Sequence, residues 1–159
     1  MRRTVTLLIT TIALVTTLSA CGAGQDAATR MITQVTDGVE KTINVDGNKI
    51  KLVNFLLVAT EDGSAVVVGS VINQGETDDQ IISISAAGAQ ATLSGDTIAK
   101  PHQPVRFEGE QANAKAVFPA VGAVAGRHVV LSVGFARAGV VQLEVIIRDK
   151  RDAYASVTA

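Results

Sequence analysis

Short runs rich in Val and Ile, separated by clusters of Gly, Asp, Asn and Pro, constrain the fold of this chain more than any other feature. The interruptions recur about every eight to twelve residues, the spacing typical of an antiparallel sandwich or barrel. Asp46 and Gly47 predict a hairpin turn, because glycine tolerates the positive φ that tight turns require. Residues 61–64 predict the next turn. No stretch requires a long helix, so we expect an all-β domain.

Four apolar segments between these turns are predicted to be strands. They are rich in β-branched residues, which favour the extended conformation. Pro101 and Pro104 indicate an exposed loop or sheet edge near residue 102, since proline cannot donate to a strand ladder. The predicted strands cover residues 49–60, 65–73, 80–85 and 91–94.

Two segments near the C-terminus show the clearest alternation of apolar and polar residues. Such alternation is typical of strands that bury one face. A short linker at residues 136–139 separates them, so we expect a hairpin. The apolar faces consist of Val129, Leu131, Val133 and Phe135 in the first segment and of Val141, Leu143, Val145 and Ile147 in the second.

The first residues have the three zones of an export signal. Arg2 and Arg3 form a positive start, residues 4–17 form a mostly apolar core, and small residues precede the cysteine. The apolar core has about 14 residues, fewer than the ~18 that a membrane-spanning helix needs, so a retained helix is not expected. The last four residues, Leu18, Ser19, Ala20 and Cys21, have the form of a bacterial lipobox, whose cysteine is lipidated and becomes the mature N-terminus.

Cys21 is the only cysteine of the chain, and it stands where lipoprotein processing requires a thiol. An ordinary secretory signal with an incidental Cys21 is the less favoured alternative. A diacylglycerol on Cys21 supplies two acyl chains, which anchor a protein stably where one chain does not. We therefore expect a lipid anchor on the extracytoplasmic face of the cell membrane. The predicted parts are a signal peptide (1–20), the lipidated cysteine and a tether (21–31), a β-domain (32–152) and a C-terminal tail (153–159).

The remaining sequence carries few residues that indicate chemistry. The 14 basic and 15 acidic residues of the whole chain form no run of like charge, so nucleic acid is not an expected partner. The chain has no Gly-x-Ser-x-Gly or Ser-x-x-Lys motif, and His102 and His128 have no adjacent partner, so we expect neither an enzyme nor a bound cofactor. Glu76, Asp78 and Asp79 lack the spacing of an EF-hand and are interpreted as a charged surface loop.

Residues 126–145 resemble the closing hairpin of the PCuAC-type copper chaperone superfamily. The lipobox at Cys21, the apolar run 50–58, and the run 65–73 with the polar loop after it follow in the order seen in LpqE-type actinobacterial lipoproteins, a branch of that superfamily. The resemblance implies a single antiparallel β-sandwich, cupredoxin-like or immunoglobulin-like, in the cell envelope.

The ligand set of those chaperones is not repeated in this sequence. They bind Cu(I) through methionine sulfurs and histidines, as expected for a soft ion. Here Met31 is the only methionine after the initiator, and no His-x-Met pair occurs. The resemblance therefore transfers no metal ligand to this chain, and His102, His128 and Met31 are the only candidates.

The sequence as a whole favours a non-catalytic lipoprotein that serves as a binding or assembly module of the cell envelope. Its expected partners are the membrane, through the lipid on Cys21, and an envelope protein or ligand. The alternative is a copper chaperone of PCuAC type with atypical ligands.

Replacing Cys21 by Ala tests the anchor. We expect Cys21→Ala to move the protein out of the membrane fraction and to abolish its labelling by a clickable fatty acid, because no thiol remains to be acylated. Fractionation and in-gel fluorescence measure both effects. Unchanged membrane retention of the variant would refute lipidation at this residue.

Overall fold

The computed structural model describes residues 37–159, which form strands and one short helix. The predicted signal peptide, the lipobox with Cys21, and Met31 lie outside the described residues. No helix within residues 37–159 has the length and apolar character needed to cross a bilayer. The elements are β1 (Val39–Val45), β2 (Asn48–Ala59), β3 (Ala65–Asn73), β4 (Asp79–Ala86), β5 (Ala89–Gln90), β6 (Thr92–Gly95), β7 (Ile98–Ala99), β8 (Val105–Arg106), β9 (Ala114–Phe118), β10 (His128–Phe135), β11 (Gly139–Asp149) and the 3-10 helix η1 (Asp152–Tyr154).

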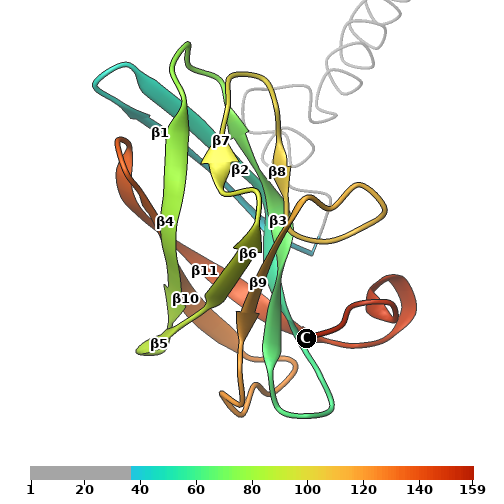
Figure 1. Ribbon diagram of the computed structural model, residues 1–159. Coiled ribbons are helices and arrows are strands. Elements are labelled where there is room, and N and C mark those ends of the chain that lie inside the picture. The colour runs from blue at the N-terminus through green and yellow to red at the C-terminus, as the bar shows by residue number, and fades with distance from the viewer. Residues whose placement is uncertain (1–36) are drawn as a thin grey trace, which may run out of the picture. The chain divides into compact units, whose positions relative to one another are not determined.

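The strands join in one hydrogen-bonded path that curves until it nearly closes on itself (Figure 1). Neighbours follow the order β5-β4-β10-β11-β2-β3-β9-β6, while β1, β7 and β8 attach to β2, β4 and β3. The ends of the path approach each other because Ala91 N donates to Ile84 O at 2.8 Å and Ile81 N donates to Thr97 O at 2.9 Å. These bonds tie β4 to the chain on both sides of β6.

The all-β prediction is confirmed, and the strand pairs are antiparallel except for β11 with β2. The residues alone left sandwich and barrel open, and the resemblance favoured two sheets. The structure is a nearly closed, barrel-like sheet, because β2 pairs with two strands, β1 and β11, along the same edge. Its first part pairs with β1 up to Phe55, and Leu57 to Ala59 pair with β11. The long strand β2 thus joins strands that would lie in two separate sheets of a sandwich.

The predicted strands are found close to their expected positions. β3 coincides with residues 65–73, and the C-terminal hairpin pairs Leu131 with Leu143 and Val133 with Val141. All four of these side chains are buried in the main hydrophobic cluster, as the alternation predicted. The turn at residues 136–139 is also confirmed.

A β-bulge in β2 keeps the interior face of this strand continuous. Val53 pairs with Ser70 and Leu56 pairs with Val68, so two residues, Asn54 and Phe55, lie opposite one. Asn54 adopts a φ of 55°, a conformation that asparagine tolerates better than most residues. An extra residue shifts the alternation by one. The inward positions are therefore even-numbered before the bulge and odd-numbered after it, as the main cluster shows for Ile50, Leu52, Phe55 and Leu57.

The single residue opposite the bulge is Gly69, and the Phe55 ring covers it. A Cβ at position 69 would lie 2.8 Å from that ring, and the φ of 147° also disfavours a side chain. Phe107 packs edge-on against Phe55 with ring centroids 6.0 Å apart, and its N–H donates to Gly69 O at 3.0 Å. Glycine is required here because it admits an aromatic ring directly over the backbone.

The last residues of the chain cover the outer face of β2 and β3. Val157 is buried together with Leu56, Val58 and Val66, and Tyr154 packs against them. These outward positions are apolar because a second, smaller cluster buries them. Two residues of segment 153–159, which was expected to be a short tail, thus pack on the domain, while the others are exposed.

Asp79 fastens the start of β4 to the turn between β10 and β11. It is 4% exposed, and its carboxylate accepts the backbone N–H of Arg137 and of Ala138, each at 2.9 Å. Its interpretation as part of an exposed charged loop was wrong. A buried carboxylate is retained here because two turn amides that face the interior need an acceptor.

Asp79→Ala is expected to lower the free energy of unfolding by about 3 kcal/mol, because two buried or partly buried amides lose their only acceptor. Asp78→Ala is the matched control, since Asp78 is exposed and should change stability little. Urea denaturation followed by circular dichroism measures both variants. Equal stability of the two would contradict the fastening role.

Candidate functional site

The two predicted histidines lie at opposite ends of the barrel. His102 follows Pro101 on an exposed loop, and its N–H donates to Asn73 O at the end of β3. His128 begins β10 and lines a cavity together with Ala65, the first residue of β3. The nine residues of β3 span about 26 Å, so the two imidazoles do not share one site.

The described residues offer little to a soft metal ion. No group of three or more His, Cys, Asp or Glu side chains converges within residues 37–159, and this segment contains no cysteine or methionine. Asp79 is engaged with backbone amides and is not a free ligand. The donor set of residues 37–159 therefore does not fit a Cu(I) site built from thioethers and imidazoles.

An apolar cavity of about 210 Å³ opens at the barrel end that holds His128. The loop from β9 to β10, residues 119–127, forms its outer wall. Buried side chains of the main cluster form its floor, and small residues such as Ala65 leave the space unfilled. The floor consists of Leu57, Ala65, Phe118 and Ile147.

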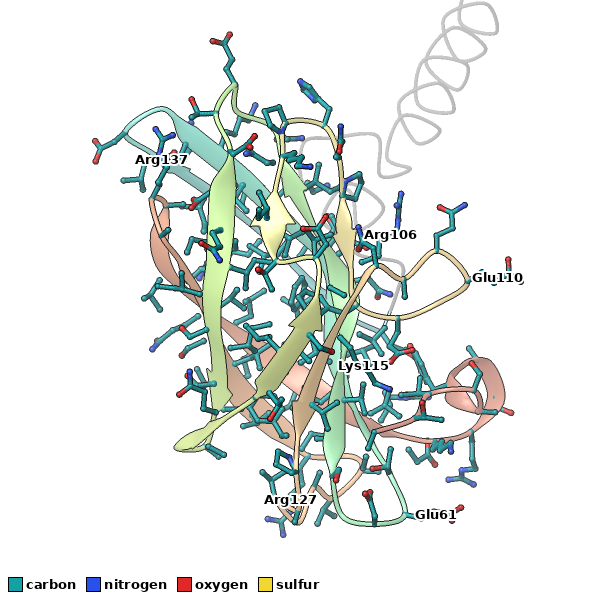
Figure 2. The ribbon with its side chains drawn as sticks, in the orientation of Figure 1. Glu61, Arg106, Glu110, Lys115, Arg127 and Arg137 are labelled. Atoms are coloured by element: carbon teal, nitrogen blue, oxygen red, sulfur yellow. The ribbon has the colours of Figure 1, made fainter. Side chains whose placement is uncertain are left out.

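The rim of the cavity combines exposed apolar side chains with positive charge. Val121 is 40% exposed and Val124 is 53% exposed, although both are large apolar residues. Arg127 and His128 stand beside them. Figure 2 shows Arg127 at the same end of the barrel as Glu61, whereas Arg137 lies at the opposite end. Arg127 forms no ion pair with any residue of the described segment.

Hydrogen bonds at both of its ends hold the loop 119–127 over the cavity. At one end, Ala120 N donates to Ser64 Oγ at 3.3 Å and Gly122 N donates to Gly63 O at 3.0 Å. At the other, Gly126 N donates to Ile147 O at 2.8 Å. The middle of the loop, which carries Val124, has fewer such ties. These hydrogen bonds therefore fix the loop 119–127 to the β2–β3 turn and to β11.

Asp62 organises the turn that supports this loop. Its carboxylate accepts Thr60 Oγ1 at 2.5 Å, Ser64 N at 3.1 Å and Ser64 Oγ at 3.0 Å. The hydrogen bond from Thr60, followed by those from Ser64, lowers the pKa of Asp62 below its ordinary value. Asp62 accepts the Ser64 hydroxyl hydrogen, which leaves the Ser64 oxygen to accept the Ala120 N–H of the cavity loop.

A wider groove beside β11 has its arginines paired with acidic residues. This groove of about 530 Å³ contains Arg148 and Arg151. Arg148 pairs with Asp37 at 3.6 Å, and Arg151 pairs with Asp149. The cavity at Arg127 is distinguished from this groove by a cation that keeps no acidic partner among the described residues.

Sequence reasoning missed the cavity and its loop. The signal that could have indicated it is the run of small and apolar residues at 120–126, which lies outside any strand yet carries Val121 and Val124. Large contiguous exposed apolar patches are the ones that mark interaction sites, so these two valines alone are a weak signal. The sequence indicated His128 as a possible metal ligand, whereas the structure places it on the rim of the cavity.

Comparisons with known proteins bear on the fold. No protein-family model matches the chain, and no curated protein matches it in sequence. Solved structures do match. The fold is PCuAC-like. The apo PCuAC domain from PmoF1 is 20% identical with a TM-score of 0.57, and the match covers 70% of this chain and 99% of that one.

Two further structures give the same result. The copper-bound PCuAC domain from PmoF2 is 16% identical with a TM-score of 0.58, and its apo form is 15% identical with a TM-score of 0.56. Each match covers 70% of this chain and 98% of the other. Identities this low establish a shared fold, and function is argued from the site.

Proposed function

We propose that this protein is a membrane-anchored extracytoplasmic lipoprotein of LpqE type, with a domain that acts as a non-catalytic binding module of the cell envelope. Its binding site is the cavity at the barrel end, walled by residues 119–127. The lipid on Cys21 would keep this module at the membrane surface. The cavity beside Arg127 is the single observation that carries the proposal.

The mouth of a β-barrel is a common place for a ligand site. Here the mouth is apolar inside and has exposed Val121 and Val124 at its edge, together with Arg127, which has no acidic partner within residues 37–159. What sets Val121 and Val124 apart from other exposed valines is their place at the mouth of this apolar cavity. The imidazoles of His102 and His128 have no carboxylate partner among the described residues, which is one reason to propose binding and not catalysis.

A photo-crosslinking amino acid at position 124 tests the site in living cells. We expect position 124 to form adducts with envelope components, because it overhangs the cavity. Position 140 is the matched control: Val140 is also an exposed valine, 69% accessible, but it lies on β11 outside the cavity lining. Mass spectrometry compares the adducts. Equal or absent adducts at both positions would overturn the proposal.

A second candidate function, copper binding with atypical ligands, is favoured by one observation, the fold shared with a copper-bound PCuAC domain. The donor set opposes it. A tight Cu(I) site needs several soft ligands close together, and residues 37–159 supply imidazoles at opposite barrel ends and no sulfur. Met31 would have to contribute the only thioether of the mature chain.

Titration of the protein with Cu(I) against a competing chelator separates the two functions. We expect no stoichiometric tight site, and we expect His102→Ala and His128→Ala to leave the titration unchanged. A tight site that is lost in His128→Ala or in Met31→Leu would establish the copper function in place of the first.

A further inference from the structure

The size of the cavity limits what can enter it. Its volume is about 210 Å³. An apolar cavity of about 150 Å³ holds a benzene molecule, and pockets for drug-sized ligands begin near ~300 Å³. The cavity therefore accommodates a narrow apolar group longer than one ring, and it is too small for the two chains of a diacyl lipid.

The lining determines the polarity of that group. Leu57, Phe118 and Ile147 form a floor without a polar side chain, so a group inserted there would find no hydrogen-bond partner. Burying a polar group without a partner is costly. An unbranched hydrocarbon chain satisfies both the volume and the polarity of this floor.

Charge at the rim selects the other end of the ligand. The Arg127 guanidinium has no acidic partner among the described residues, and a guanidinium binds carboxylate or phosphate through two parallel hydrogen bonds. His128 adds a second donor on the same rim. A neutral alkyl ligand or an apolar side chain of a protein would leave this charge unused.

The geometry points to a single-chain anionic amphiphile as the ligand, with a medium-length alkyl chain in the cavity and its carboxylate or phosphate on Arg127. This assignment rests on the proposed function, because it names the ligand class of that same site. Exposed Val121 and Val124 cover the part of the chain that leaves the cavity. Free fatty acids and lysophospholipids share this chemistry.

Photolabelling of the full chain in its own membranes tests the assignment. The probe is decanoic acid with a diazirine on its chain. We expect adducts within residues 119–129, located by tandem mass spectrometry. Octanoate should compete with the probe. Octanol should need at least about three times the concentration of octanoate for the same competition, because it lacks the charge that an exposed Arg127 recognises. A lysophospholipid competitor distinguishes the two sources, since the better competitor identifies the natural head group.

Two matched variants locate the charge. Arg127→Gln should reduce labelling about threefold, the effect of losing one partly exposed ion pair. Arg137→Gln, at the opposite end of the barrel, should leave labelling unchanged (Figure 2). Ala123→Trp should abolish labelling by filling the cavity from its wall. Arg127→Gln lies on the surface, so its result does not depend on whether the Trp variant folds.

Adducts spread over the barrel, equal competition by octanol and octanoate, or equal labelling of the two Gln variants would each overturn the assignment. If position 124 still captures a protein or a diacyl lipid in cells, the proposed binding function is kept and the single-chain amphiphile is rejected as its ligand. If position 124 captures nothing specific, the proposed function fails as well.

Discussion

The packing of Phe55 on Gly69 is the contact on which the rest of this barrel depends. The bulge at Asn54 and Phe55 places two residues of β2 opposite one residue of β3. This restores the inward direction of the apolar side chains after the strand bends. Without it, Leu57 would turn outward and Leu56 inward, and the second half of β2 would present the wrong face. The ring can occupy this position because Gly69 has no side chain.

The same strand pair builds the candidate site. The β2–β3 turn presents Gly63 and Ser64 to the loop 119–127, and β11, which pairs with the end of β2, holds the other end of that loop. Small residues at Ala65 and Ala123 leave volume between the loop and the floor. The cavity thus forms at the end of the barrel, and it opens to solvent beside Arg127.

The chain shares the PCuAC fold with proteins that include a copper-bound domain, although its own described donors do not assemble a comparable ligand set. The apolar core of this barrel is built mainly from strand residues, with Ala123 and Ala138 of the end loops packed against it or in it. The shared fold gives the architecture alone, and the proposed binding site lies at loop 119–127 of this chain.

The sequence by itself predicted the longer strands and several turns, because alternation and turn chemistry are local; the lipid anchor stays a prediction, since Cys21 lies outside the described residues. The strand at residues 65–73 and the hairpin around Leu131 and Leu143 were predictable from the pattern of apolar residues alone. Tertiary structure decided the parallel pairing of β11 with β2, the burial of Asp79, the separation of His102 from His128, and the cavity. Each of these depends on which distant segments become neighbours, and a local pattern of hydrophobicity carries no information about the partner that a strand edge or a loop will meet.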